Sequence, residues 1–399
     1  MGRLWTSSFI ILTISMLFLF TSVCLLIPTL PFFIKNLGGT ESQVGIIVGT
    51  FTISAVIFRP IIGGFLDRYG RKPFIVFGLI LFLVLMCFYN WVSGLWILIL
   101  LRFLHGIGWA ISTTSIGTAV TDIVPTTRRG EGMGWYGLAM TISMAVGPML
   151  GIWLLQKYSF HGLFSVAIFF SIIALLLGLI LKLPIQFQHK ARRIELFDSS
   201  MFPVGLAIVF LTIPYGGITA FLPLFVESIK VNAGTFFLMY AVSLSFIRPI
   251  AGKLTDRYDE SVVIKLSVII SSMALLVLSF SSGLVGVIFS AILYGIGFGS
   301  AQPAIQTYMI NLARPDRKGI ANASYFTSFD LGIGLGAIIL GWIYPFIGYQ
   351  YLFIVCAISI MISYFMLVII LRRTRKITSH YNYLKTNNPK NLSTKDQQM

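Results

Sequence analysis

Long apolar segments recur along nearly the whole chain, and short polar segments separate them. Each apolar segment is long enough to cross about 30 Å of hydrocarbon as a single helix. The pattern predicts an all-α membrane protein of about twelve helices. The expected spans are 7–31, 43–65, 74–93, 95–121, 132–156, 161–183, 200–226, 233–253, 262–281, 284–310, 320–345 and 349–371.

Composition agrees with a chain that faces lipid. Of its 399 residues, 57% are hydrophobic and only 11% are charged, and the mean hydropathy is +0.90. A soluble domain carries about 25% charged residues, so most of the outer surface must face the bilayer. Cys24, Cys87 and Cys356 fall within apolar spans without the spacing of a metal or disulfide pair, which favours a packing role.

Positive charge is distributed unevenly among the polar segments. The 29 Lys and Arg residues against 13 Asp and Glu residues give a net charge of +16, which raises the question of nucleic acid binding. All but four of the 29 lie in alternate segments or at the adjoining helix ends; the exceptions are Lys35, Lys157 and Lys230 opposite them and Arg102 in mid-helix. Basic loops stay cytoplasmic. Both termini of this multi-pass cell-membrane protein are therefore predicted to be cytoplasmic, with the lipid bilayer and not nucleic acid as partner.

The chain contains an internal repeat. Arg59-Pro60-Ile61 recurs as Arg248-Pro249-Ile250, and Asp67-Arg68-Tyr69 recurs as Asp256-Arg257-Tyr258, both at an offset of 189 residues. Two six-helix halves in parallel orientation are expected of a transporter whose halves rock about a central site. The predicted organisation is an N-terminal half (1–183), a cytoplasmic linker (184–199), a C-terminal half (200–371) and a disordered basic cytoplasmic tail (372–399).

The loop after the second predicted helix reads G-G-F-L-D-R-Y-G-R-K and resembles the signature loop of the major facilitator superfamily, G-x-x-x-D-R-x-G-R-K. The resemblance implies a gating relay of acidic and basic side chains; ordinary cytoplasmic loop charge is the alternative. The matching residues are Gly63, Asp67, Arg68, Gly70, Arg71 and Lys72, joined by Asp122 at the end of the fourth helix. The second copy has Asp259 and Glu260 in place of the glycine and arginine, which leaves its gating role open.

The fourth helix carries Leu98-x3-Arg102-x2-His105-Gly106-x-Gly108. This resembles the pattern L-x-x-x-R-x-x-Q-G-x-G of drug:proton antiporters in the superfamily. Arg102 and His105 share one helix face, and an arginine at mid-membrane usually faces a cavity or a partner. We expect both to serve proton coupling, with structural hydrogen bonding as the alternative.

The fifth helix carries a second antiporter-like signature. Gly134-x8-Ser143-x3-Gly147-Pro148-x2-Gly151 resembles G-x8-G-x3-G-P-x2-G-G, with two glycines replaced. The resemblance implies export. The alternative is a packing groove, because small residues at this spacing let helices approach closely.

Asp330 is the only acidic residue placed well inside an apolar span. Burial away from water favours the protonated form of a carboxyl group, so Asp330 is predicted to carry a proton; a neutral or arginine-paired structural aspartate is the alternative. Weaker candidates for a substrate cavity, together with Arg102, are Trp109, Tyr136, Tyr240, Tyr294, Gln302, Gln306 and Tyr325.

No enzyme motif, metal box or nucleotide-binding loop is present in the sequence, so we expect no enzyme activity and no cofactor. The resemblance implies a monomeric, proton-coupled exporter of a small molecule. Arg102 and His105 favour an anionic or zwitterionic metabolite, and the sequence is similar to Gram-positive exporters of opine-type metallophores. The alternatives are a multidrug efflux antiporter, uptake by proton symport, and a membrane sensor on a transporter scaffold.

Overall fold

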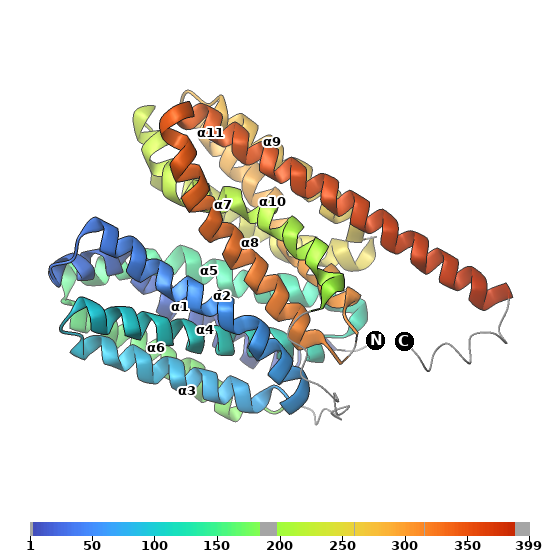
Figure 1. Ribbon diagram of the computed structural model, residues 1–399, viewed down its shortest axis with the longest axis horizontal. Helices are drawn as coiled ribbons and strands as arrows, with labels where there is room; N and C mark the ends of the chain where they lie inside the picture. Colours follow the sequence, from blue (N-terminus) through green and yellow to red (C-terminus); the bar gives the residue numbers. More distant parts are fainter. Residues whose placement is uncertain (1–2, 184–197, 259, 315, 388–399) are drawn as a thin grey trace.

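The computed structural model describes residues 3–183, 198–258, 260–314 and 316–387 (Figure 1). These residues form helices joined by short turns, as expected where lipid offers no partner for backbone polar groups. The helices are α1 (Ser7–Asn36), α2 (Glu41–Tyr69), α3 (Lys72–Phe88), α4 (Leu95–Ile123), α5 (Arg129–Lys157), α6 (Phe160–Ile180), α7 (Phe202–Ser228), α8 (Ala233–Arg257), α9 (Glu260–Ser279), α10 (Leu284–Leu312) and α11 (Lys318–Asn387), with single 3-10 turns at Tyr89–Trp91, Thr126–Arg128 and Ser199–Met201.

Helix α11 crosses the membrane twice. Among the described residues, eleven helices are long and apolar enough to span a bilayer, and the last of these spans is 56 residues long. That length would reach about 84 Å as a straight helix, far more than the roughly 30 Å of hydrocarbon. Gly348 has φ 72° and ψ 178°, a conformation that reverses the chain and is open to glycine. The predicted twelve-helix fold is confirmed.

The molecule consists of two helical halves. One hydrophobic core gathers side chains of α1 to α6, and a second gathers side chains of α7 to α11. In Figure 1 the blue-to-teal half and the green-to-red half lie one against the other. Bulky apolar side chains such as Trp96, Phe246 and Phe346 are between 74% and 87% exposed, as expected of surfaces that contact lipid.

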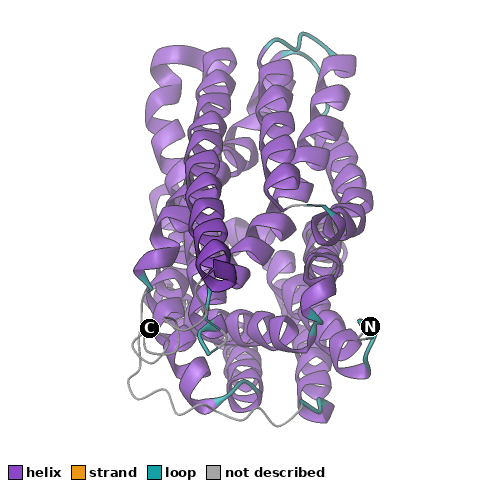
Figure 2. Cartoon of the chain, turned by 90° about the vertical axis from the view of Figure 1, so that its right-hand side faces the viewer, coloured by secondary structure: helices purple, strands orange, loops and turns teal. Residues whose placement is uncertain are grey.

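The two halves meet mainly through two helix pairs, α2 with α11 and α5 with α8. The contacts gather where α2 and α8 end and where α5 and α11 begin; we call this the inner end of the molecule. Toward the opposite, outer end the halves diverge (Figure 1). Figure 2 shows the molecule from the inner end, with helices and short loops as its described elements.

The described residues include part of the predicted tail but little of the predicted linker. The linker prediction falls mostly on residues 184–197, which lie outside the described residues. The tail prediction is wrong for residues 372–387, because α11 continues to Asn387. The polar composition there suggested disorder, but helical hydrogen bonds extend from the apolar span into the polar sequence that follows. Residues 388–399 lie outside the described residues.

Candidate functional site

The halves cross at two pairs of glycines related by the internal repeat. A Cβ atom added to Gly63 of α2 would lie 2.9 Å from the carbonyl oxygen of Gly319 in α11. A Cβ added to Gly252 of α8 would lie 2.9 Å from the Cα of Glu131, next to Gly130 in α5. Glycine is needed at both crossings because the backbones approach too closely for any side chain.

Each crossing ends in a carboxylate that caps a helix of the other half. Asp67 accepts hydrogen bonds from the backbone N–H groups of Gly319 and Ile320 at 2.7 and 3.0 Å. Asp256 accepts from Gly130 and Glu131 at 2.6 and 2.7 Å. A negative charge at a helix N-terminus satisfies free N–H groups and complements the helix dipole. The two aspartates therefore join the two halves at the inner end.

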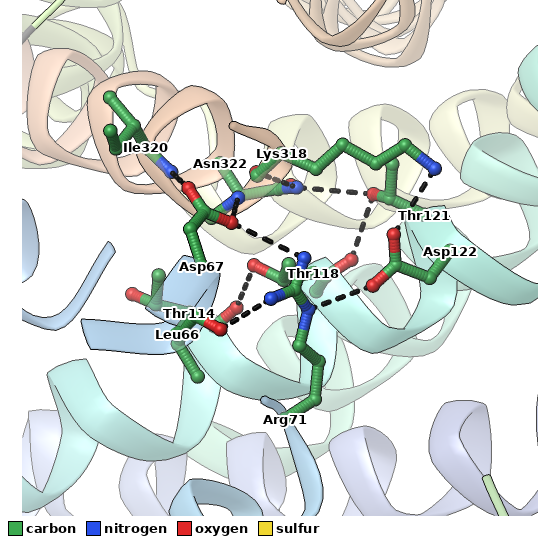
Figure 3. A network of polar contacts seen from close by, with 12 residues as sticks. Leu66, Asp67, Arg71, Thr114, Thr118, Thr121, Asp122, Lys318, Ile320 and Asn322 are labelled. Atoms are coloured by element: carbon green, nitrogen blue, oxygen red, sulfur yellow. Dashed lines mark hydrogen bonds and ion pairs between the residues drawn. The ribbon is translucent and has the colours of Figure 1, made fainter. Parts of the chain in front are cut away.

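A charged triad stands beside Asp67, as Figure 3 shows. Arg71 Nε donates to Asp122 Oδ2 at 2.8 Å, and Arg71 Nη2 lies 3.2 Å from Asp67 Oδ1. Lys318 Nζ, from the other half, lies 3.1 Å from Asp122 Oδ1. The structure thus brings together the three residues of the predicted relay and adds Lys318, which joins the relay to the second half. Its gating role remains a prediction.

The second half contains a matching triad with different chemistry. The repeat relates Arg71, Asp122 and Lys318 to Glu260, Asn311 and Arg129. Arg129 donates to the side-chain oxygen of Asn311, whose amide nitrogen donates to Glu260. The sequence left a role for this copy open because its arginine is absent. The structure shows that a glutamate, an amide and an arginine make the equivalent chain of contacts.

Of the other residues of the predicted loop motif, Gly70 permits the turn and two lie at the surface. Gly70 has φ 87° and ends α2, where a side chain would be strained. Arg68 is exposed and stacks on Tyr69 at 5.2 Å, and Lys72 begins α3 as an exposed residue. Of the predicted relay residues, Asp67, Arg71 and Asp122 therefore make the polar contacts at the inner end, which we call the inner latch.

Replacing Gly63 with leucine is expected to open the inner end. The added side chain would clash with Gly319 and Ala323, so the α2–α11 crossing should separate. We expect Thr121→Cys, at a position buried beneath the crossing, to react at least roughly tenfold faster with an impermeant maleimide in inside-out vesicles. Gly45→Leu in the same helix is the matched control, because a Cβ there meets no described atom within 4 Å. Equal rates in both variants would contradict the prediction.

An ion pair joins the halves within the membrane spans. Arg59 Nη2 of α2 lies 2.8 Å from Asp330 Oδ2 of α11, and Arg59 Nη1 donates to Thr113 Oγ1 and Thr114 Oγ1 at 3.0 and 3.3 Å. The Arg59 side chain is 2% exposed and that of Asp330 is 23% exposed. A cytoplasmic helix end was the predicted place of Arg59, as of most basic residues, and this is wrong: the side chain is buried between α2, α4 and α11.

Arg102 and His105 lie together but belong to another cluster. The Tyr89 hydroxyl lies 3.1 Å from His105 Nδ1 and 3.5 Å from Arg102 Nη1. Arg102 also stands over the Phe51 ring at 4.2 Å, and His105 is fully buried. This cluster lies between α2, α3 and α4 inside the first half, whereas Asp330 meets Arg59. The structure therefore does not bring Arg102 and His105 to Asp330.

The glycine-rich signature of α5 is a contact surface for two helices. Cβ atoms added to Gly147 and Gly151 would overlap Cys24 and Leu25 of α1, and Ser143 donates to Leu17 of α1 at 2.7 Å. Gly134 instead lies against the backbone of Arg248 in α8. Pro148 is half-buried in the same helix. One face of α5 thus packs within its half, and its first turns pack across the interface.

The weaker cavity candidates fall into two groups. Tyr240, Tyr294 and Tyr325 belong to an aromatic cluster of the second half with Tyr215 and Phe298; Trp109 packs on Phe20 at 4.6 Å in the first half. Two others make polar contacts within the second half: Gln302 accepts from Arg248, and Gln306 donates to Asn322 at 3.3 Å. Tyr136 is buried, and its hydroxyl has no hydrogen-bond partner among the described residues.

Two pseudo-symmetric six-helix halves, latched at one end and joined within the membrane by an ion pair, define a secondary transporter of the alternating-access type. The chain belongs to the major facilitator superfamily, whose family model matches residues 10–337 and, in a second overlapping match, residues 206–394. It is a multi-pass membrane transporter and not an enzyme.

Two relatives come from Staphylococcus aureus. The chain is 25% identical over 379 residues to the staphylopine export protein, covering 89% of this chain and 94% of the relative. It is 25% identical over 344 residues to the quinolone resistance protein NorA, covering 83% and 88%. Among solved structures, the human organic anion transporter MFSD10 superposes with a TM-score of 0.75 at 16% identity, covering 90% of this chain and 99% of that one. The last likeness concerns the fold alone.

Proposed function

We propose that this transporter exports a small zwitterionic metabolite in exchange for protons. The observation that carries the proposal is the ion pair between Arg59 and Asp330, which crosses from one half to the other. Charged side chains within membrane spans usually mark a substrate or proton pathway. A ligand or proton that breaks this pair acts directly on the contact between the halves.

Exchange requires that substrate and proton exclude one another. A zwitterion replaces both partners, with its carboxylate on Arg59 and its ammonium on Asp330. Once Asp330 is protonated it no longer attracts the ammonium, so proton and substrate compete. A substrate with anionic groups alone binds Arg59 best when Asp330 is protonated, and would travel together with the proton. The pair therefore favours a zwitterion for exchange and a simple anion for cotransport.

The direction of transport rests on three supports. The α5 signature resembles that of exporters, one relative is named as an export protein, and the predicted topology places the inner end in the cytoplasm. With the inner end closed, Asp330 would take a proton from outside and release substrate there. When the inner end then opens, Asp330 would release that proton to the cytoplasm before new substrate binds.

Multidrug efflux is the second candidate, because NorA is named for quinolone resistance. A lipophilic drug would use the aromatic cluster around Tyr215, Tyr240 and Phe298 and need not engage Arg59. A sensor on a transporter scaffold, the third candidate, would move no substrate at all.

Deleting the gene is expected to trap zwitterionic metabolites inside the cell. Untargeted mass spectrometry of cells and medium should show compounds that rise inside and fall outside at least roughly tenfold, and restoring the gene should reverse this. Inside-out vesicles should then accumulate the same compounds only when the vesicle lumen is more acidic than the surrounding buffer. Loss of resistance to dyes and quinolones without any trapped metabolite would instead support multidrug efflux. No change in either measurement would favour the sensor.

A further inference from the structure

The second half contains a counterpart of Arg59 that has no carboxylate partner among the described residues. Arg248 of α8 occupies the position that the repeat relates to Arg59 of α2. It is 6% exposed. Its guanidinium donates to the backbone oxygen of Gly137 in α5 and to the side-chain oxygen of Gln302 in α10, and both of these acceptors are neutral.

The surroundings of the two arginines correspond position by position. Thr113, which accepts from Arg59, corresponds to Gln302, which accepts from Arg248. Phe326, whose ring lies 5.0 Å from the Arg59 guanidinium, corresponds to Gly137, where an added Cβ would lie 2.9 Å from Arg248 Nη1. The repeat therefore predicts where a partner for Arg248 would stand.

That position holds Thr141, the counterpart of Asp330. The Thr141 hydroxyl donates to the Gly137 oxygen at 3.1 Å, so it shares this acceptor with Arg248 and brings no negative charge. Arg248 Nε has no hydrogen-bond partner among the described residues. A buried charge without a counter-ion is costly. Of the two arginines, only Arg59 has a carboxylate partner among the described residues, so the charge of Arg248 is left without a counter-ion there.

The two arginines face a common region of the interface. Gly137, the acceptor of Arg248, follows Tyr136 in α5. An added Cβ on Gly117 would lie 3.4 Å from the Tyr136 hydroxyl and 3.1 Å from the Phe326 ring, and Arg59 stands over that ring. This chain of neighbours places both guanidinium groups along one part of the interface, and the Tyr136 hydroxyl, which has no hydrogen-bond partner among the described residues, stands between them.

We propose that Arg248 is a second anion-binding residue, so that the substrate carries at least two anionic groups and one amine. Its first carboxylate would bind Arg59, its ammonium Asp330, and its second anionic group Arg248. The amino dicarboxylates are the simplest class with these groups. This inference rests on the proposed zwitterion exchange and adds the net negative charge of the substrate.

Replacing Thr141 with aspartate tests the inference without removing Arg248. The new carboxylate stands where the repeat places a partner, so it should pair with Arg248 and occupy the proposed anion site. We expect export of the metabolites that deletion cells retain to fall at least tenfold, while the amount and thermal stability of the protein stay level or rise. Thr141→Asn has nearly the same size without charge, and should keep at least a third of the export. Arg248→Gln should lose export as Thr141→Asp does.

The retained compounds are themselves the second readout. Esterification with deuterated methanol counts their carboxylates, and an amine-reactive label counts their amines. Two or more anionic groups with one amine support the inference. Full export by Thr141→Asp, or retained compounds with a single anionic group, would overturn it and leave the proposed exchange intact if Asp330→Asn abolishes export. Deletion cells that retain no compound, or Asp330→Asn protein that exports the retained compounds as well as the wild type does, would overturn the proposed function instead.

Discussion

Asp330→Asn is expected to lower proton-driven export by at least roughly tenfold and to remove its dependence on a pH gradient. Asparagine keeps the size of the side chain and an acceptor for Arg59, but it neither binds a proton nor attracts an ammonium group. Replacing the charge-assisted contact with a neutral one costs about 1.5 kcal/mol, which is roughly tenfold in binding. The measurement is uptake of a trapped metabolite by inside-out vesicles at several pH gradients.

Stability measurements separate the ion pair from its role in transport. Arg59→Gln leaves Asp330 without its 2.8 Å partner, and a broken pair of this kind costs about 3 kcal/mol when buried. The double variant Arg59→Gln with Asp330→Asn has no charge left to compensate and should unfold near the wild-type temperature in detergent. It should nevertheless fail to export. Asp330→Glu keeps the carboxylate and is the matched control. Normal pH-dependent export by Asp330→Asn would show that Asp330 carries no proton.

Much of the fold follows from the sequence because lipid imposes a simple rule on it. Apolar segments of sufficient length must be helices, so twelve spans were predictable, as was the repeat. The ends of the helices were not. Helix α2 begins at Glu41 and ends at Tyr69, beyond the predicted 43–65, because helices continue into polar sequence at the membrane surface.

The site divides into local contacts, which the sequence predicts, and distant contacts, which it does not. Arg71 follows Asp67 by four residues, across the Gly70 turn that ends α2, so the short loop motif made their pairing predictable. Arg59 and Asp330 are 271 residues apart, and only packing of α2 on α11 brings them together. The pattern of apolar spans singles out Arg102 as the arginine in mid-membrane. Arg59 also falls inside a predicted span, and its repetition as Arg248 was a second signal.

The second triad shows why comparing motifs letter by letter undervalues a diverged copy. Glu260 replaces an arginine and Asn311 replaces an aspartate, so both changes appear to abolish the motif. An amide both donates and accepts hydrogen bonds, and Asn311 therefore links Arg129 to Glu260. The chain of contacts is therefore the same in both triads, although the charges of the side chains differ.

Loss of the two capping carboxylates is expected to shift the transporter to its inward-facing state. Asp67 and Asp256 each accept two backbone hydrogen bonds from the opposite half. Charge-assisted bonds at a helix N-terminus contribute about 1 to 2 kcal/mol per residue. Removing both, as Asp67→Asn with Asp256→Asn, should therefore change the equilibrium by about 3 kcal/mol, or roughly a hundredfold.

Spin labels at the inner ends of α2 and α8 report this shift. Cysteines replacing Arg68 and Tyr258, both exposed, would carry the labels after Cys24, Cys87 and Cys356 are changed to serine. The distance distribution should move to longer values in the double variant and partly so in each single variant, because either carboxylate alone still holds one crossing. Asp316→Asn removes an exposed charge beside the start of α11 and should leave the distances unchanged. If the double variant matched this control, the carboxylates would not hold the inner end closed, and the glycine crossings would be the remaining cause.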